Sequence, residues 1–144
     1  MAPGLPKLLV DTNIILDVVL ERKTWLQESA DILQAISTGR ARGFVAGHAL
    51  TTLYYLHAKT RGRAVATAAI GDVLQICDAV PLTSSDFQRA LALGLNDFED
   101  GVTAAAALSI GADYLVSRNE KDFKGSSVRV RSPGQVLALL PVIT

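Results

Sequence analysis

Lys7-Leu-Leu-Val-Asp-Thr-Asn13, followed directly by Ile14-Ile-Leu-Asp17, is the stretch of sequence that decides the fold. Its apolar residues up to Val10 predict a buried strand, and a helical pattern starts immediately after Asn13. In a parallel α/β sheet, ligands bind outside the carboxyl ends of the strands, which is where Asp11 stands. Asn13 is a suitable N-cap for the helix that follows. Helix capping alone explains an Asp-x-Asn pattern equally well, so a catalytic role for Asp11 needs support from elsewhere in the chain.

The composition is that of one folded domain. The chain has 144 residues, of which 49% are hydrophobic and 19% are charged. This length is usual for a single domain, and this hydrophobic content excludes a disordered chain. No apolar run approaches the ~18–20 residues that span a bilayer, and the first residues lack the basic segment of a signal peptide. We therefore expect one domain over residues 1–144, located in the cytoplasm and not in a membrane.

The charges balance but are unevenly distributed. Fourteen Lys and Arg residues oppose fourteen Asp and Glu residues, so the formal net charge is zero. A strong non-specific nucleic-acid binder would have a basic excess, so the composition argues against that class of protein. No acid lies between Ile32 and Gly71, a stretch that contains Arg40, Arg42 and the basic group from Lys59 to Arg63. This asymmetry fits a basic face beside an acidic cleft, and it fits scattered surface charges equally well.

Short apolar segments alternate with helical patterns along the chain. The segments predicted as strands are rich in Val, Leu or Phe, which is typical of strands covered on both faces. They are Lys7–Val10, Gly43–Ala46, Cys77–Leu82, Tyr114–Ser117 and Val128–Arg131. The predicted helices are Asn13–Glu21, Thr24–Thr38, Ala49–Arg61, Arg63–Ile76, Asp86–Leu95, Phe98–Ile110 and Pro133–Leu140. This alternation predicts an α/β fold, a three-layer α/β/α sandwich around a central parallel sheet of four to five strands.

A cluster of acids opens the helix predicted from Phe98. Asn96-Asp-Phe-Glu-Asp100 precedes Gly-Val-Thr and four alanines. Residues three apart share a helix face, so we expect Asp97 and Asp100 to point together and Glu99 to point elsewhere. A helix N-terminus favours acids, but capping requires one acid and this turn has three. Clustered carboxylates suit Mg²⁺ or Mn²⁺, whereas Zn²⁺ prefers the Cys and His ligands that this chain scarcely has.

A third polar cluster follows the strand predicted from Tyr114. Leu115-Val-Ser-Arg-Asn-Glu-Lys-Asp-Phe123 places Ser117 at the end of that strand, and Asn119 and Asp122 in the turn after it. Parallel strands end at the same edge of a sheet, so these side chains are expected near Asp11. Turn formation and helix capping explain Asn119 and Asp122 equally well.

The three motifs, in this order, resemble those of the PIN-domain family, which includes the VapC-like ribonuclease toxins of bacteria and archaea. The resemblance extends from Leu8 to Leu140, almost the whole chain. It implies a Mg²⁺- or Mn²⁺-dependent nuclease with an acidic pocket at the carboxyl ends of a parallel sheet. It implies further that Asp11 and Asp97 or Asp100 hold the metal, with Asn13 and Asn119 in support.

The chain departs from this family pattern at one position. Many active members have a glutamate near the start of the third helix, within a Thr-x-x-Glu pattern. The corresponding stretch here is Ala49-Leu-Thr-Thr-Leu-Tyr-Tyr-Leu56, which places Thr52 at the glutamate position. The pocket is therefore expected to have one negative charge fewer. It would then bind one metal instead of two, bind metal weakly, or lack nuclease activity.

The first functional hypothesis is a metal-dependent endoribonuclease, the toxin of a toxin–antitoxin pair, that cleaves single-stranded RNA or a structured loop. Its catalytic residues and metal ligands would be Asp11, Asp97 and Asp100. The supporting residues would be Asn13, Ser117, Asn119 and Asp122. The candidates for contacting the RNA backbone are Arg118, Lys121, Arg40 and Arg42. The resemblance to the toxins also predicts an antitoxin partner and a homodimer.

Two other hypotheses compete with this one. Thr52 and the neutral net charge favour a PIN-fold module that binds RNA or a protein partner and cuts slowly or not at all. An aspartyl-phosphate enzyme with Asp11 as the nucleophile is the third hypothesis. Phosphatases of the haloacid dehalogenase type need a second aspartate two residues after the nucleophile, where this chain has Asn13.

Overall fold

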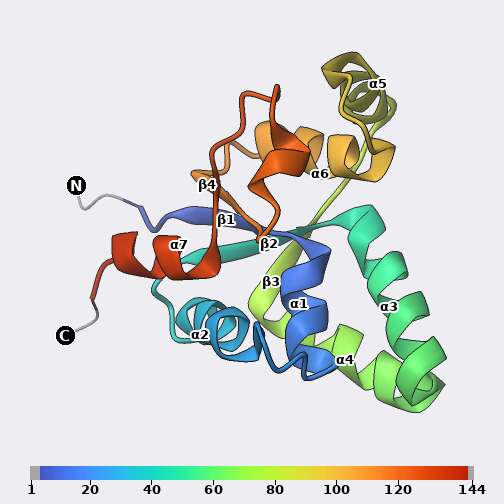
Figure 1. The fold of residues 1–144 in the computed structure, drawn as a ribbon, viewed down its shortest axis with the longest axis vertical. Helices are drawn as coiled ribbons and strands as arrows, with labels where there is room; N and C mark the ends of the chain where they lie inside the picture. The colour runs from blue at the N-terminus through green and yellow to red at the C-terminus, as the bar shows by residue number, and fades with distance from the viewer. Residues whose placement is uncertain (1–3, 143–144) are drawn as a thin grey trace.

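The central sheet has five parallel strands. The computed structural model describes residues 4–142 (Figure 1). The strand order is β3-β2-β1-β4-β5. The strands are β1 (Lys7–Val10), β2 (Arg42–Ala46), β3 (Cys77–Val80), β4 (Tyr114–Val116) and β5 (Val130–Arg131). All five predicted strands are confirmed, although the two edge strands are shorter than predicted. β3 ends before Pro81, which has no N–H group to continue the ladder.

Seven α-helices within the described residues connect and flank the strands. They are α1 (Thr12–Val19), α2 (Leu26–Ser37), α3 (Gly47–Arg61), α4 (Arg63–Ile76), α5 (Ser84–Leu93), α6 (Phe98–Ser109) and α7 (Pro133–Leu139). A short 3₁₀ helix, η1 (Glu120–Phe123), follows β4. Each predicted helix is confirmed, with small shifts at its ends. α5 begins earlier than predicted because Thr83 caps it, and the Thr83 N–H donates to Asp86 Oδ2 at 2.9 Å.

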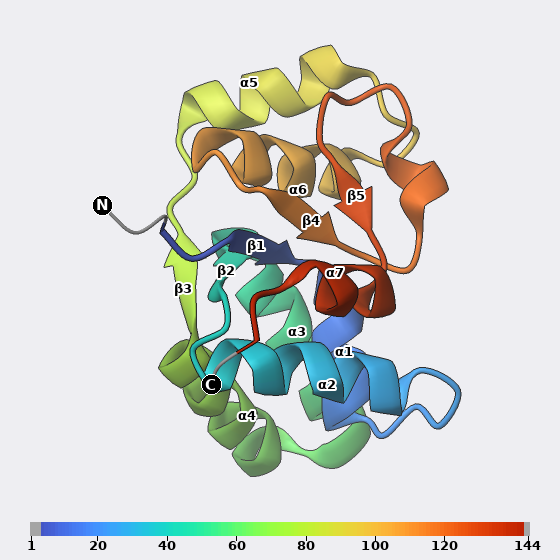
Figure 2. The same ribbon diagram turned by 90° about the vertical axis from the view of Figure 1, so that its left-hand side faces the viewer.

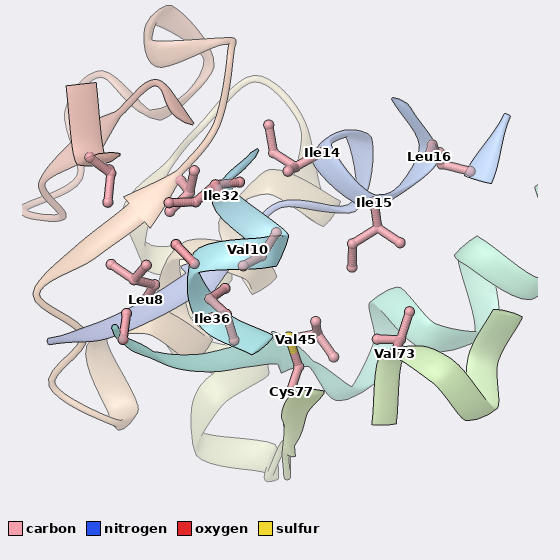
Figure 3. Packing of buried hydrophobic residues seen from close by; sticks show 14 of the residues in the cluster. Leu8, Val10, Ile14, Ile15, Leu16, Ile32, Ile36, Val45, Val73 and Cys77 are labelled. Carbon is pink, nitrogen blue, oxygen red and sulfur yellow. The ribbon is translucent and has the colours of Figure 1, made fainter. Parts of the chain in front are cut away.

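The helices cover both faces of the sheet. Figure 2 shows α5 and α6 on one side of the sheet and α2, α4 and α7 on the other. The larger core lies on the second side, where Leu8, Val10 and Val45 of the sheet belong to one buried cluster with Ile32 and Val73 (Figure 3). Burying an aliphatic side chain of this size stabilises a fold by roughly 1.5–3 kcal/mol. The predicted three-layer α/β/α sandwich is confirmed.

α6 packs closely on its neighbours because its buried residues are small. Every residue from Gly101 to Ala107 is buried, and Leu9, Phe44 and Leu115 of the sheet share a core with its alanines. On its other side α6 contacts α5, and a Cβ at Gly101 would lie 2.9 Å from the carbonyl oxygen of Ala90. This close packing holds the acidic first turn of α6 in a defined position beside the sheet.

The carboxyl ends of the central strands meet at one edge. β1 pairs with β4 in the register Val10↔Val116, and the Asp11 N–H extends the ladder to the Val116 carbonyl at 3.0 Å. α3 begins directly after β2, at Gly47, and so starts from the same edge. Several connections therefore bring polar side chains to this edge, as the sequence predicted. No helix within residues 4–142 is long and apolar enough to cross a membrane.

Candidate active site

A cleft of about 320 Å³ opens at the carboxyl edge of the sheet. It is lined from the β1–α1 junction, α3, the first turn of α6, and η1. The lining residues are Asp11, Thr12, Asn13, Leu16, Thr52, Leu56, Asp97, Glu99, Asp100, Thr103 and Asp122. Five of these are carboxylates, and no lysine or arginine of the described chain lines the cleft. The cleft is therefore strongly acidic, although the chain as a whole is neutral.

Asp11 lines the cleft from the end of β1 and is almost completely buried. Its Oδ2 accepts a hydrogen bond from Ser117 Oγ at 2.9 Å. Burial raises the pKa of Asp11, whereas hydrogen bonds from Ser117 and from the Thr12 N–H oppose that rise. The negative charge of Glu99 raises this pKa further. Ser117 therefore lies where the sequence placed it, at the end of β4 and against the Asp11 carboxylate.

Asp97 and Asp100 lie together in the first turn of α6, as their spacing predicted. Asp97 is the N-cap of the helix, and its Oδ1 accepts a hydrogen bond from the Asp100 N–H at 3.1 Å. Burial raises the pKa of Asp100 to about 7, and the charges of Asp97, Asp11, Asp122 and Glu99 contribute to that rise. The carboxylates are therefore close enough to repel one another, and Asp100 is near its titration midpoint at neutral pH.

Glu99 also lines the cleft, so the prediction that it points elsewhere is wrong. Its Oε1 is 4.0 Å from His48 Nε2 on α3. The prediction considered only the helix face that Asp97 and Asp100 share. It missed Glu99 because α3 borders the cleft beside this turn, and no spacing within α6 encodes that tertiary contact.

The predicted supporting residues are only partly brought together. Asp122 lines the cleft from η1, but Asn119 does not. The Asn119 N–H donates to Ser117 Oγ at 3.1 Å, so Asn119 contacts the site through its backbone and not through its side chain. Asn13 lines the cleft but is not the N-cap of α1, because that helix begins at Thr12 with Asp11 in the capping position. Asn13 Oδ1 instead accepts a hydrogen bond from Arg22 Nη1 at 3.4 Å.

Comparison with known proteins identifies the family. Residues 7–121, most of the chain, match the family described as PIN domain. The chain belongs to the PIN-domain family. It is similar to ribonuclease VapC1 from Aquifex aeolicus (strain VF5), with 24% identity over 129 residues that cover 86% of this chain and 88% of that protein.

Solved structures share the fold of this chain. VapBC2 from Rickettsia felis, solved bound to a DNA fragment from its promoter, matches with a TM-score of 0.71 and 15% identity over 88% of this chain and 98% of that one. VapC20 from Mycobacterium tuberculosis, described as a sarcin–ricin loop cleaving toxin, matches with a TM-score of 0.68 and 14% identity over 84% of this chain and 95% of that one. Likeness at this level of identity establishes the shared fold.

Arg118 of this PIN domain takes part in a buried ion pair, and its role as a candidate RNA contact stays a prediction. Its Nε and Nη2 donate to both carboxylate oxygens of Asp17, at 2.8 and 2.9 Å. Its guanidinium also lies over Trp25, 3.8 Å from the ring centroid. Asp17 is fully buried and accepts a further hydrogen bond from Ser29 Oγ at 3.0 Å. The ion pair joins α1 to the segment after β4 and so holds Ser117 beside Asp11.

The other predicted RNA-binding residues do not share one surface of the PIN fold. Two arginines lie at the amino end of the sheet, and one lysine lies near the cleft. Arg42 begins β2, at the amino end of the sheet, and its guanidinium lies 5.1 Å from the Phe44 ring centroid. Arg40 lies two residues earlier, and its Nε donates to the Pro141 carbonyl at 3.1 Å. Both arginines are therefore at the edge opposite the cleft. Lys121 is the exception, because it is exposed in η1 next to Asp122.

The donor atoms of the cleft suit a hard divalent cation. Carboxylate and amide oxygens are the ligands that Mg²⁺ and Mn²⁺ prefer. Neither histidine lines the cleft, and burial lowers the pKa of His48. Within residues 4–142, no three His, Cys, Asp or Glu side chains form a ready-made metal site.

Proposed function

We propose that this PIN-domain protein is a metal-dependent endoribonuclease that hydrolyses RNA phosphodiester bonds. The proposal is carried by one observation: Asp11, Asp97 and Asp100 line a single acidic cleft at the carboxyl edge of a PIN fold. Similarity to ribonuclease VapC1 supports RNA as the substrate.

Asp11, Asp97 and Asp100 would hold Mg²⁺ or Mn²⁺, with Asp122 on the η1 side of the cleft. A cation of this kind lowers the pKa of a coordinated water and offsets negative charge on a phosphate oxygen. Asp100 would be fully ionised in the loaded site, because a nearby positive charge favours the ionised form of a carboxylate.

The other groups of the cleft would orient the ligands and the substrate. The hydrogen bond from Ser117 restricts rotation of the Asp11 carboxylate. The capping hydrogen bond from the Asp100 N–H restricts Asp97 in the same way. Lys121, exposed beside Asp122, would contact an RNA phosphate next to the cleft.

The proposal extends to the biological setting. The protein would be the toxin of a toxin–antitoxin pair, a homodimer in the cytoplasm that a protein antitoxin holds inactive. The VapC and VapBC proteins to which the chain is similar support this setting. Its substrate would be single-stranded RNA or a structured loop, since the backbone of such RNA can enter a narrow cleft.

One observation favours a second function, that of a catalytically weak or inactive PIN module that binds RNA or a protein partner. Thr52 lines the cleft from α3, where the resemblance leads us to expect a glutamate. Its hydroxyl hydrogen-bonds back to the His48 carbonyl at 3.5 Å and brings no charge to the cleft. Weak metal binding and slow cleavage would follow if no other side chain supplied that charge.

Cleavage of labelled single-stranded RNA distinguishes the two functions. With Mn²⁺ or Mg²⁺ the parent protein should cut the RNA, and EDTA should stop the reaction. Asp11→Asn should abolish cleavage while the circular dichroism spectrum is unchanged. Asp72→Asn is the matched control, because Asp72 is exposed on α4 and does not line the cleft. Equal cleavage by Asp11→Asn and the parent would reveal a contaminating nuclease and leave the binding module as the function.

A further inference from the structure

A second pocket, of about 420 Å³, lies outside the acidic cleft and shares none of its lining residues. It is formed by η1, the loop that follows η1, and β5, which is the edge strand of the sheet (Figure 2). Its basic lining residues are Lys121, Lys124 and Arg131, and Glu120 is the one acid among the described residues that line it. This basic pocket therefore has an excess of positive charge, opposite in sign to the cleft.

The two lysines come from one side of η1. Side chains three residues apart in a 3₁₀ helix lie over one another. Lys121 and Lys124 have this spacing and both line the basic pocket, whereas Asp122 lines the cleft. Both lysines are exposed, and neither forms an ion pair with an acid of the described chain. Their ammonium groups are therefore available to an anion from outside the protein.

Arg131 enters the basic pocket from the end of β5. It is half-buried, and its Nη1 donates to the Val130 carbonyl at 2.7 Å, which is its one side-chain hydrogen bond within residues 4–142. No carboxylate of the described chain pairs with it. A guanidinium has five N–H donors in a planar fork that matches the oxygens of a phosphate group. Most of the Arg131 fork is therefore available for such a group.

The basic pocket and the cleft lie along the same edge of the sheet. The strand register pairs Val10 with Val116 and Val116 with Arg131, so β1 and β5 end at that edge on either side of β4. Neighbouring strands are about 4.8 Å apart, which separates the ends of β1 and β5 by about 10 Å. A further hollow, of about 440 Å³, lies over η1 and shares Asp122 with the cleft and Lys121 with the basic pocket. The surface is therefore continuous from one to the other.

We propose that the basic pocket binds a phosphate of the RNA backbone that flanks the phosphate cleaved in the cleft. Arg131 holds this flanking phosphate through two donors, and Lys121 and Lys124 add positive charge. The inference rests on the proposed nuclease function and describes how that enzyme holds its substrate. A phosphate contact positions RNA without reading its bases. The basic pocket therefore acts on any single strand long enough to reach from the cleft across η1.

Titration with inorganic phosphate tests the basic pocket without RNA or metal. The probe is added to the ¹⁵N-labelled full chain in EDTA, at an ionic strength held constant with chloride, and amide shifts are followed by NMR. The amides of Gly125 and Ser126, which line the basic pocket, should shift to saturation in the parent. Arg131→Gln should abolish the saturable shift. Arg129→Gln is the matched control, because Arg129 is exposed and does not line the basic pocket.

Shifts that do not saturate, or that are the same in Arg131→Gln and the parent, would overturn the phosphate site.

Cleavage of single-stranded RNA with Mn²⁺ tests the source of the phosphate. Arg131→Gln should raise KM roughly tenfold, as expected for a hydrogen-bonded charge contact, and leave kcat unchanged. The slope of log(kcat/KM) against log[salt] should become less steep by about 0.7, because one phosphate contact of a single strand is lost. Arg129→Gln should match the parent in KM and in slope.

A KM and slope unchanged by Arg131→Gln, in a protein that does bind inorganic phosphate, would overturn RNA as the occupant and favour an acidic segment of a protein partner. If the parent cleaves no RNA, the proposed nuclease function fails and RNA as the occupant fails with it. The phosphate titration distinguishes these failures, because it needs neither cleavage nor a metal.

Lys124→Gln keeps the test decisive if circular dichroism shows that Arg131→Gln is misfolded. The Lys124 side chain is exposed and makes no hydrogen bond within the described residues, so its loss should not affect folding. This variant should also raise KM and make the salt slope less steep by about 0.7. An unchanged KM and slope would then overturn the inference.

Discussion

Replacing Arg118 by alanine is predicted to destabilise the fold strongly. Asp17 is fully buried and accepts two hydrogen bonds from Arg118, one from Ser29, and a longer one from Arg22 at 3.5 Å. Leaving a buried charge without its partner costs about 3–5 kcal/mol. Ser29 and Arg22 remain as partners, which lowers this cost, but the lost contact with Trp25 adds about 0.5–2 kcal/mol. We therefore expect Arg118→Ala to lower the free energy of unfolding by about 3–5 kcal/mol.

Urea denaturation followed by tryptophan fluorescence measures this loss. Trp25 is the only tryptophan of the chain and lies directly under the Arg118 guanidinium, so its emission reports on the network itself. In a thermal melt the same loss corresponds to a decrease in Tm of roughly 9–20 °C, at ~3–4 °C per kcal/mol for a domain of this size. Arg129→Ala is the control, since Arg129 is exposed and should change stability by about 0.5 kcal/mol or less.

A second substitution tests the cause of the loss. Asp17→Asn in the Arg118→Ala background removes the buried charge, so the double variant should be more stable than Arg118→Ala alone. If Arg118→Ala costs no more than Arg129→Ala, or if Asp17→Asn only adds to its cost, the ion pair does not neutralise Asp17. An unaltered stability combined with weaker RNA binding would instead support Arg118 as an RNA contact.

The other predictions concern charge, packing and assembly. The pKa of Asp100 is raised from 3.8 to about 7, so the folded metal-free protein holds this proton more tightly than the unfolded chain does. Stability should therefore fall as pH rises between those two values, and Asp100→Asn should flatten the fall in melts with EDTA; an unchanged slope would contradict the raised pKa. Gly101→Val should lower the free energy of unfolding by about 1–3 kcal/mol through overpacking against Ala90, and urea melts without this loss would mean that α5 can move aside. Sedimentation at micromolar concentration should give about twice the 15.3 kDa of one chain, and a monomer at every concentration would exclude the homodimer.

The elements of this fold were predictable because their signals are local. Each strand is a short apolar segment bounded by turn residues, and each helix carries its own periodicity. The meeting of Asp11 and Ser117 was predictable for a topological reason. Parallel strands end at the same edge of a sheet, so polar residues that follow β1 and β4 must be neighbours. The joint orientation of Asp97 and Asp100 needed only the spacing of a helix.

The remaining features depend on tertiary contacts that local patterns do not contain. Glu99 lines the cleft because the first turn of α6 approaches the start of α3 at His48, and no pattern within either helix predicts that contact. Arg118 was named from the sequence only as a candidate RNA contact, and nothing in its position along the chain shows that it forms an ion pair with the buried Asp17. Arg42 was grouped with the other basic residues by its position in the chain, although the direction of β2 places it at the opposite edge from the cleft.

The placement of the charges makes binding of RNA in the cleft depend on a cation. The cleft has five carboxylates and no basic lining residue within the described chain, so an RNA phosphate would be repelled there. Two like charges 4 Å apart repel by about 4 kcal/mol at the effective dielectric constant of a protein surface. RNA could therefore enter this cleft only together with a cation. In the nuclease, loss of the cation removes binding in the cleft and cleavage at once, whereas a binding module that uses another surface would retain its RNA in EDTA. The dependence of RNA binding on the cation is thus the property that separates the two functions.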